Sequence, residues 1–164
     1  MKNNIIKNGF FGGLIVSIVM MGMTFYIKAN PEYEPNAIIG FTSMFLAFTF
    51  VILGIKQQRE ANNGVISFGK ALVTGLLISL IISVIYVLVW LVVYYNFFPD
   101  FMERYSEMVL KNTKPDELAA KTTEMNQMIG WYKSPVMVIL LTLMEIFPIG
   151  ILVSFVGTLI LKKK

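Results

Sequence analysis

The sequence predicts an all-α integral membrane protein with four transmembrane helices and two short amphipathic helices in the outer loop between the third and the fourth. Composition gives the first reason: 56% of the 164 residues are hydrophobic and 15% are charged, against roughly 25% charged residues in a soluble domain. The second reason is that long uncharged intervals alternate with segments that hold the charged residues. A chain of this length is expected to form one domain.

Three spans follow from the uncharged intervals. An ionised side chain in hydrocarbon is costly, and a spanning helix needs about 20 apolar residues. The sequence carries no charged residue over 8–27, 35–55 and 71–99. We therefore expect transmembrane helices at approximately 9–27, 37–55 and 71–95. The basic start of the chain also resembles a cleaved signal peptide, but no Ala-x-Ala cleavage site follows the apolar run, so we expect the first span to be retained.

The fourth span, expected at 136–161, depends on the orientation of the chain because Glu145 interrupts its apolar run. Basic residues near span ends favour the cytoplasm. The basic residues that we expect on that side are Lys2, Lys7, Lys56, Arg59, Lys70, Lys162, Lys163 and Lys164. The connection after the first span holds only Lys28, with Glu32 and Glu34. Bringing the C-terminal lysines to the cytoplasmic side requires 136–161 to cross, so both termini are expected in the cytoplasm.

The extracytoplasmic loop, 100–133, is too polar to cross a membrane. Apolar residues nevertheless recur in it at helical spacing on both sides of a break near 112–115. They are Phe101, Met102, Tyr105, Met108, Val109, Leu118, Met125, Met128 and Ile129. We expect two short amphipathic helices whose apolar faces lie on the outer leaflet or cap the bundle.

Small residues at helical spacing mark the faces on which the spans are expected to pack. Lipid tails are as apolar as leucine, so close approach of two helices in a membrane depends on small residues. The residues that we expect at helix contacts are Gly9, Gly13, Gly40, Gly75, Ser79 and Gly150. Such stripes serve equally for contacts within one bundle and for contacts between two copies of the chain.

Glu145 is the single charged residue inside an expected span, and such residues are costly and often functional. Pro148 removes an amide donor one turn later and frees the carbonyl of Met144. Counting residues from the span ends brings Tyr86 and Ser83 to a similar depth. One interpretation is a protonated acid that hydrogen-bonds across helices and holds a kinked span. The other is a proton or cation relay.

Enzymatic chemistry is poorly represented in this sequence. The chain has no Cys and no His, which excludes disulfides, imidazole catalysis and ordinary zinc sites. Asp100, Glu103 and Glu107 could act as acid–base groups, but Arg104 lies among them, as on a solvated helix face. Several methionines could bind Cu(I), yet they lack His or Cys partners and are explained by packing. These methionines are Met20, Met21, Met23, Met102, Met108, Met125 and Met128. We expect no enzyme activity, no cofactor and no metal.

Three stretches carry a resemblance to a known family that runs nearly end to end. They are NGVISFGKAL at 63–72, PDF at 99–101 and EIFPIG at 145–150. Together they resemble the bacterial four-span proteins known as domain of unknown function 4199. The resemblance implies a bacterial inner membrane, and it implies no activity, substrate or functional residue.

The leading functional hypothesis is a small bacterial inner-membrane protein with a non-enzymatic structural, accessory or oligomeric role. Its partners would be the lipid bilayer and either further copies of the chain or an unidentified membrane protein. Basic residues flank the spans without forming a patch, so nucleic acid is not expected. The alternative is a small proton- or ion-coupled transporter or channel that uses Glu145. A third hypothesis, a lipid-modifying enzyme at the outer interface, lacks both His and clustered acids.

Overall fold

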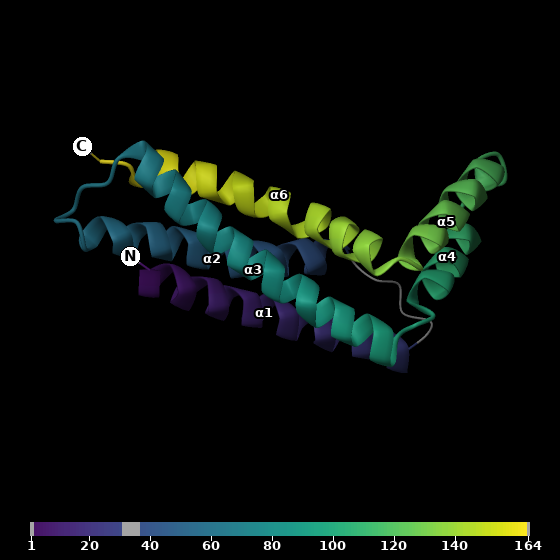
Figure 1. Cartoon of the computed structure of the whole chain (residues 1–164). Coiled ribbons are helices and arrows are strands. Elements are labelled where there is room, and N and C mark those ends of the chain that lie inside the picture. The colour runs from purple at the N-terminus through teal and green to yellow at the C-terminus, as the bar shows by residue number, and fades with distance from the viewer. Residues whose placement is uncertain (1, 31–36, 164) are drawn as a thin grey trace.

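The computed structural model describes residues 2–30 and 37–163, which are helical through most of their length (Figure 1). The helices in chain order are α1 (Lys2–Ala29), α2 (Ala37–Glu60), α3 (Phe68–Phe97), α4 (Phe101–Lys111), α5 (Leu118–Tyr132) and α6 (Pro135–Leu161). The predicted all-α class is confirmed. Glu32, Glu34 and Lys164, which enter the orientation argument, lie outside the described residues.

Four of these helices, α1, α2, α3 and α6, are long and apolar enough to cross a membrane, which confirms the predicted number of spans. The shortest, α2, has 24 residues and is about 36 Å long, more than a hydrocarbon core of about 30 Å. The helices run past the predicted span limits, since α1 begins at Lys2 and α2 ends at Glu60. A charged residue ends an apolar run, but it does not end a helical backbone.

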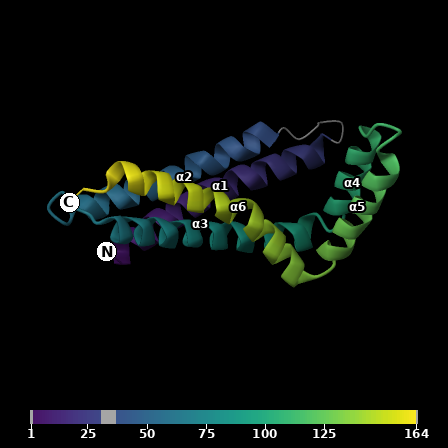
Figure 2. The ribbon, with the colours of Figure 1, turned by 90° about the horizontal axis from the view of Figure 1, so that it is seen from above.

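The bundle is built around α3, which packs against α1, α2 and α6. Helix α2 also packs against both α1 and α6, so α1 and α6 lie on opposite sides of the α2–α3 pair (Figure 1). Both termini lie at one end of the bundle, which we call the terminal end. Helices α4 and α5 lie at the other, the hairpin end, and their axes run across the bundle axis in both views (Figure 2).

The loop predicted to hold two helices contains α4 and α5, which pack against each other, while α5 also contacts α6. Met102 of α4 and Met125 of α5 are buried. The ring of Phe101 lies edge-on to Trp90 of α3, with centroids 5.0 Å apart. These contacts attach the hairpin to the ends of α3 and α6. The amphipathic character of the two helices, and their contact with a leaflet, stay predictions.

Glycines allow helices to approach closely at several places in the bundle. A Cβ atom added at Gly9 would lie 2.6 Å from Cβ of Ile81, and one at Gly13 would lie 2.8 Å from Cβ of Ile85, so α1 meets α3 there. A Cβ at Gly150 of α6 would likewise lie 2.8 Å from Cβ of Ser79 in α3. Gly40 differs, because a Cβ there would meet nothing within 4 Å among the described residues. Among the described residues, no atom of a neighbouring helix therefore lies against Gly40.

Serine side chains join α3 to α6 at the middle of the bundle. Ser79 Oγ donates to the carbonyl oxygen of Gly150 at 3.1 Å and lies 3.0 Å from Oγ of Ser154. Ser154 Oγ donates to the same carbonyl at 2.7 Å. All three residues are buried, so the two hydroxyls are paired where no water is available.

Replacing Ser79 with alanine is expected to lower the free energy of unfolding by about 0.6 kcal/mol, the average for interhelical hydrogen bonds in membranes. Ser83→Ala is the matched control, because Ser83 is equally buried but its Oγ donates to the carbonyl of Ser79 at 2.9 Å within α3. Reversible unfolding in detergent measures both variants. Equal losses from the two would show that the interhelical bond contributes nothing.

The terminal end is held together by amide groups. Asn8 Nδ2 donates to Gln57 Oε1 at 3.0 Å, and Asn4 Nδ2 donates to the carbonyl of Gly54 at 3.0 Å, which ties α1 to α2. Ile66 and Lys163 exchange backbone hydrogen bonds of 2.9 and 3.0 Å. The C-terminal segment therefore closes against the connection between α2 and α3.

Candidate functional site

Glu145 lies inside α6, ten residues after Pro135, where the helix begins. Pro135 favours a helix start because its ring fixes φ and its missing N–H is not needed there. Ten residues correspond to about 15 Å along the axis, which is half of a hydrocarbon core about 30 Å thick. The carboxyl group thus belongs to the middle part of a spanning helix.

The packed face of α6 runs through Val138, Thr142, Ile146 and Gly150, all buried. Glu145 lies one position before this face and is exposed in the single chain. One residue corresponds to a rotation of about 100° around a helix. The carboxyl group is thus carried off the packed face toward the outside of the bundle.

Pro148 adds a second acceptor beside the carboxyl group. Helix α6 continues through this proline, which supplies no N–H for the carbonyl of Met144. Met144 is itself 72% exposed. Two groups that accept hydrogen bonds, the Met144 carbonyl and the Glu145 carboxyl, therefore lie next to each other on an apolar helix.

Of the partners proposed for Glu145 from the sequence, Tyr86 lies close to it and Ser83 is engaged elsewhere. The phenols of Tyr86 in α3 and Tyr132 in α5 lie within electrostatic range of the Glu145 carboxyl group. Ser83 instead donates to the carbonyl of Ser79 in its own helix. Within residues 2–30 and 37–163, Glu145 makes no side-chain hydrogen bond. The structure thus lacks the interhelical hydrogen bond expected of Glu145.

Tyr132 is a further neighbour of Glu145, which no pattern in the sequence points to. The ring of Tyr132 packs edge-on against the ring of Tyr94, with centroids 5.5 Å apart. Tyr94 Oη donates a hydrogen bond to the backbone carbonyl of Tyr132 at 3.4 Å. Burial first, and then the charge of Glu145, raise the pKa of Tyr132 to about 12. Its hydroxyl stays protonated through physiological pH and can donate a hydrogen bond.

Asp100, an acid–base candidate from the sequence, is paired with a basic side chain. Asp100 Oδ2 accepts a hydrogen bond from Arg104 Nε at 2.6 Å, and this bond holds the pKa of Asp100 below its usual value. In the part of the chain that the structure describes, no three His, Cys, Asp or Glu side chains come close enough to hold a metal ion. Met102 and Met125 are buried in packing between helices.

A family model described as "Protein of unknown function (DUF4199)" matches residues 7–163. No curated protein and no solved structure matches the chain. The match covers all four spanning helices and the hairpin between α3 and α6. The chain therefore belongs to the DUF4199 family of proteins of unknown function.

Proposed function

We propose that the protein is a non-enzymatic accessory protein of a bacterial inner membrane that self-assembles through the surface of α6 around Glu145. In this proposal both termini lie in the cytoplasm and the α4–α5 hairpin lies outside. The single observation that carries the proposal is the position of Glu145: a carboxyl group inside a spanning helix, exposed in one chain and without a hydrogen-bond partner among the described residues.

Such a group needs a partner from outside the bundle. A charged side chain at the centre of a membrane costs about 2.5 to 3.5 kcal/mol on insertion scales. An acceptor left facing lipid has no water with which to replace its hydrogen bonds. Another protein surface that covers Glu145 can supply hydrogen bonds to the carboxyl group and shield it from lipid. Lipid tails can do neither.

A second copy of the chain meets the chemical requirement. A protonated carboxyl group both donates and accepts, so two such groups satisfy each other across a twofold axis. The exposed residues on this side of α6 also alternate in steps of three and four, as along the seam of a coiled coil. They are Glu145, Pro148, Leu152, Phe155 and Leu159. We call this set the Glu145 surface. One polar position in an apolar seam sets the register and number of helices.

Self-assembly is tested by fluorescence energy transfer between labelled copies in lipid vesicles. Glu145→Leu should weaken association about tenfold, because two interhelical hydrogen bonds are lost. Glu145→Gln should associate like the parent, since an amide also donates and accepts. Met144→Leu, which changes the neighbouring exposed residue alone, is the control. Unchanged association of Glu145→Leu would contradict the proposal.

The same variants separate self-assembly from the transporter alternative. Proton flux into the vesicles is measured alongside association. A pH-dependent flux that Glu145→Gln abolishes, with association unchanged, would replace the proposed role with a proton-coupled one. Absence of flux in the parent, together with the loss of association in Glu145→Leu, would support the accessory role.

A further inference from the structure

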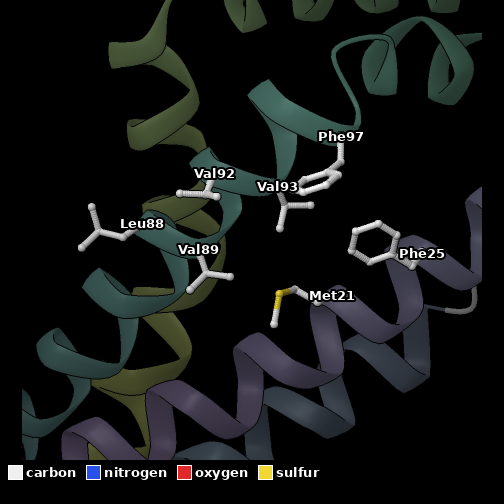
Figure 3. A pocket seen from close by; sticks show the side chains of 7 residues that line it. All are labelled: Met21, Phe25, Leu88, Val89, Val92, Val93 and Phe97. Atoms are coloured by element: carbon white, nitrogen blue, oxygen red, sulfur yellow. The ribbon is translucent and has the colours of Figure 1, made fainter.

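A groove between α1 and α3 lies near the hairpin end of the bundle, away from the Glu145 surface. Its volume is about 380 Å³, and every side chain that lines it is apolar. The lining residues are Met21, Phe25, Leu88, Val89, Val92, Val93 and Phe97. We call it the α1–α3 groove. Figure 3 shows Phe25 and Phe97 next to each other at one end of it, with ring centroids 5.5 Å apart, and Met21 pointing toward Val89.

The length of the groove fits one half of a bilayer. Its α3 wall runs from Leu88 to Phe97, which spans about 13 Å at 1.5 Å per residue. One leaflet contributes about 15 Å to a hydrocarbon core of about 30 Å. The groove therefore has the depth and the chemistry of a slot for a single acyl chain.

A positive charge is fixed at the end of the groove. Lys28 follows the lining residue Phe25 by one helical turn, at the point where the uncharged part of α1 ends. Its Nζ donates to the carbonyl oxygen of Phe97 at 2.9 Å and lies 4.8 Å from the centroid of the Phe98 ring. An ammonium group has three donors, so this bond leaves two for another acceptor.

Asp100, an acidic residue within electrostatic range of Lys28, is already paired. Asp100 feels the charge of Lys28, but its carboxylate bonds to Arg104 at 2.6 Å. These three side chains together carry one net positive charge. Asp100 thus leaves the remaining donors of the Lys28 ammonium group free to bond to an anion at the end of the groove.

We propose that the α1–α3 groove binds one acyl chain of an anionic phospholipid, with the lipid phosphate accepting hydrogen bonds from Lys28. Apolar contact in the groove holds the chain, and Lys28 selects a headgroup with net negative charge over a zwitterionic one. This proposal is independent of self-assembly, because α1 carries no part of the Glu145 surface.

Native mass spectrometry of the full chain in detergent tests the proposal by titration with phosphatidylglycerol or phosphatidylethanolamine. The parent should retain phosphatidylglycerol in preference. Lys28→Gln should weaken the binding of phosphatidylglycerol about tenfold and remove the preference for it over phosphatidylethanolamine. Lys28→Arg should keep both the affinity and the preference of the parent. Lys111→Gln, a change of a hairpin lysine remote from the groove, is the control. Val92→Trp should fill the groove and weaken both lipids equally.

Two outcomes would overturn the lipid site. If Lys28→Gln and Lys111→Gln weaken binding equally, the effect comes from net charge and not from a site. If inorganic phosphate displaces phosphatidylglycerol while Val92→Trp has no effect, the ligand is a free anion and the groove takes no acyl chain.

Discussion

Replacing Gly75 with leucine is expected to separate α3 from α6 and to lower the free energy of unfolding by about 3 kcal/mol, at the upper end of overpacking costs. A Cβ at this position would lie 2.9 Å from Cβ of Ser154 and 3.1 Å from Cδ1 of Ile55. Ser154 is fully buried, and its Cβ cannot move without its backbone. The added side chain therefore has to push the two helices apart.

Leu77→Phe is the matched control for Gly75→Leu. Leu77 lies two residues along the same helix but is 41% exposed, so a larger side chain there meets lipid or detergent. Unfolding in detergent should distinguish the two variants clearly. A loss in Leu77→Phe as large as that in Gly75→Leu would mean that the approach of α3 to α6 does not limit stability.

Cysteine labelling should find the two ends of the bundle on opposite sides of the membrane. The chain contains no cysteine, so single substitutions report without background. Ala61→Cys, in the connection at the terminal end, should be spared by a membrane-impermeant reagent applied to intact bacterial cells. Lys114→Cys, between α4 and α5, should react. The physical reason is the concentration of basic residues at the terminal end, which favours the cytoplasm.

Permeabilised cells provide the control for labelling, because both cysteines should then react. Labelling of Ala61→Cys with sparing of Lys114→Cys in intact cells would reverse the orientation. The lipid proposal predicts a groove in the leaflet on the hairpin side, so this experiment also assigns that leaflet.

The spans could be predicted from the sequence because the membrane imposes a length and excludes charge. The fourth span is interrupted by Glu145, and its prediction rested on the lysines at the C-terminus, which are expected on the cytoplasmic side. The residues at which the helices begin and end could not be predicted from the positions of charged residues. Lys2 and Glu60 are helical because backbone hydrogen bonds continue into the interface, where charge is tolerated.

The positions of small residues predicted some of the close helix contacts but not all of them. Gly75 of α3 lies against α6, and Gly150 of α6 lies against α3. A Cβ added at Gly40, by contrast, would have no atom within 4 Å among the described residues. Gly12 was not predicted, although a Cβ there would lie 2.7 Å from Cδ1 of Ile82. Spacing identifies a face of a helix, but the partner helix decides which part of that face is used.

The position of Glu145 along the bundle axis could be predicted from the sequence. The direction in which its side chain leaves α6 could not. Counting residues from the span ends placed Tyr86 near the level of Glu145, and the structure brings the two within electrostatic reach. Counting residues along the chain does not show which side of α6 faces the other helices. Because Ile146, one residue later, occupies the packed face, Glu145 lies outside it.

Crosslinking at Leu152 tests self-assembly through the Glu145 surface most directly. Leu152 is two turns from Glu145 on the same side of α6 and is 55% exposed. In native membranes, Leu152→Cys should form a crosslinked dimer, and adding Glu145→Leu should suppress it. Val84→Cys, at an exposed position of α3, should stay monomeric. Equal crosslinking of Leu152→Cys and Val84→Cys, or none at Leu152 in the parent background, would contradict assembly through this surface.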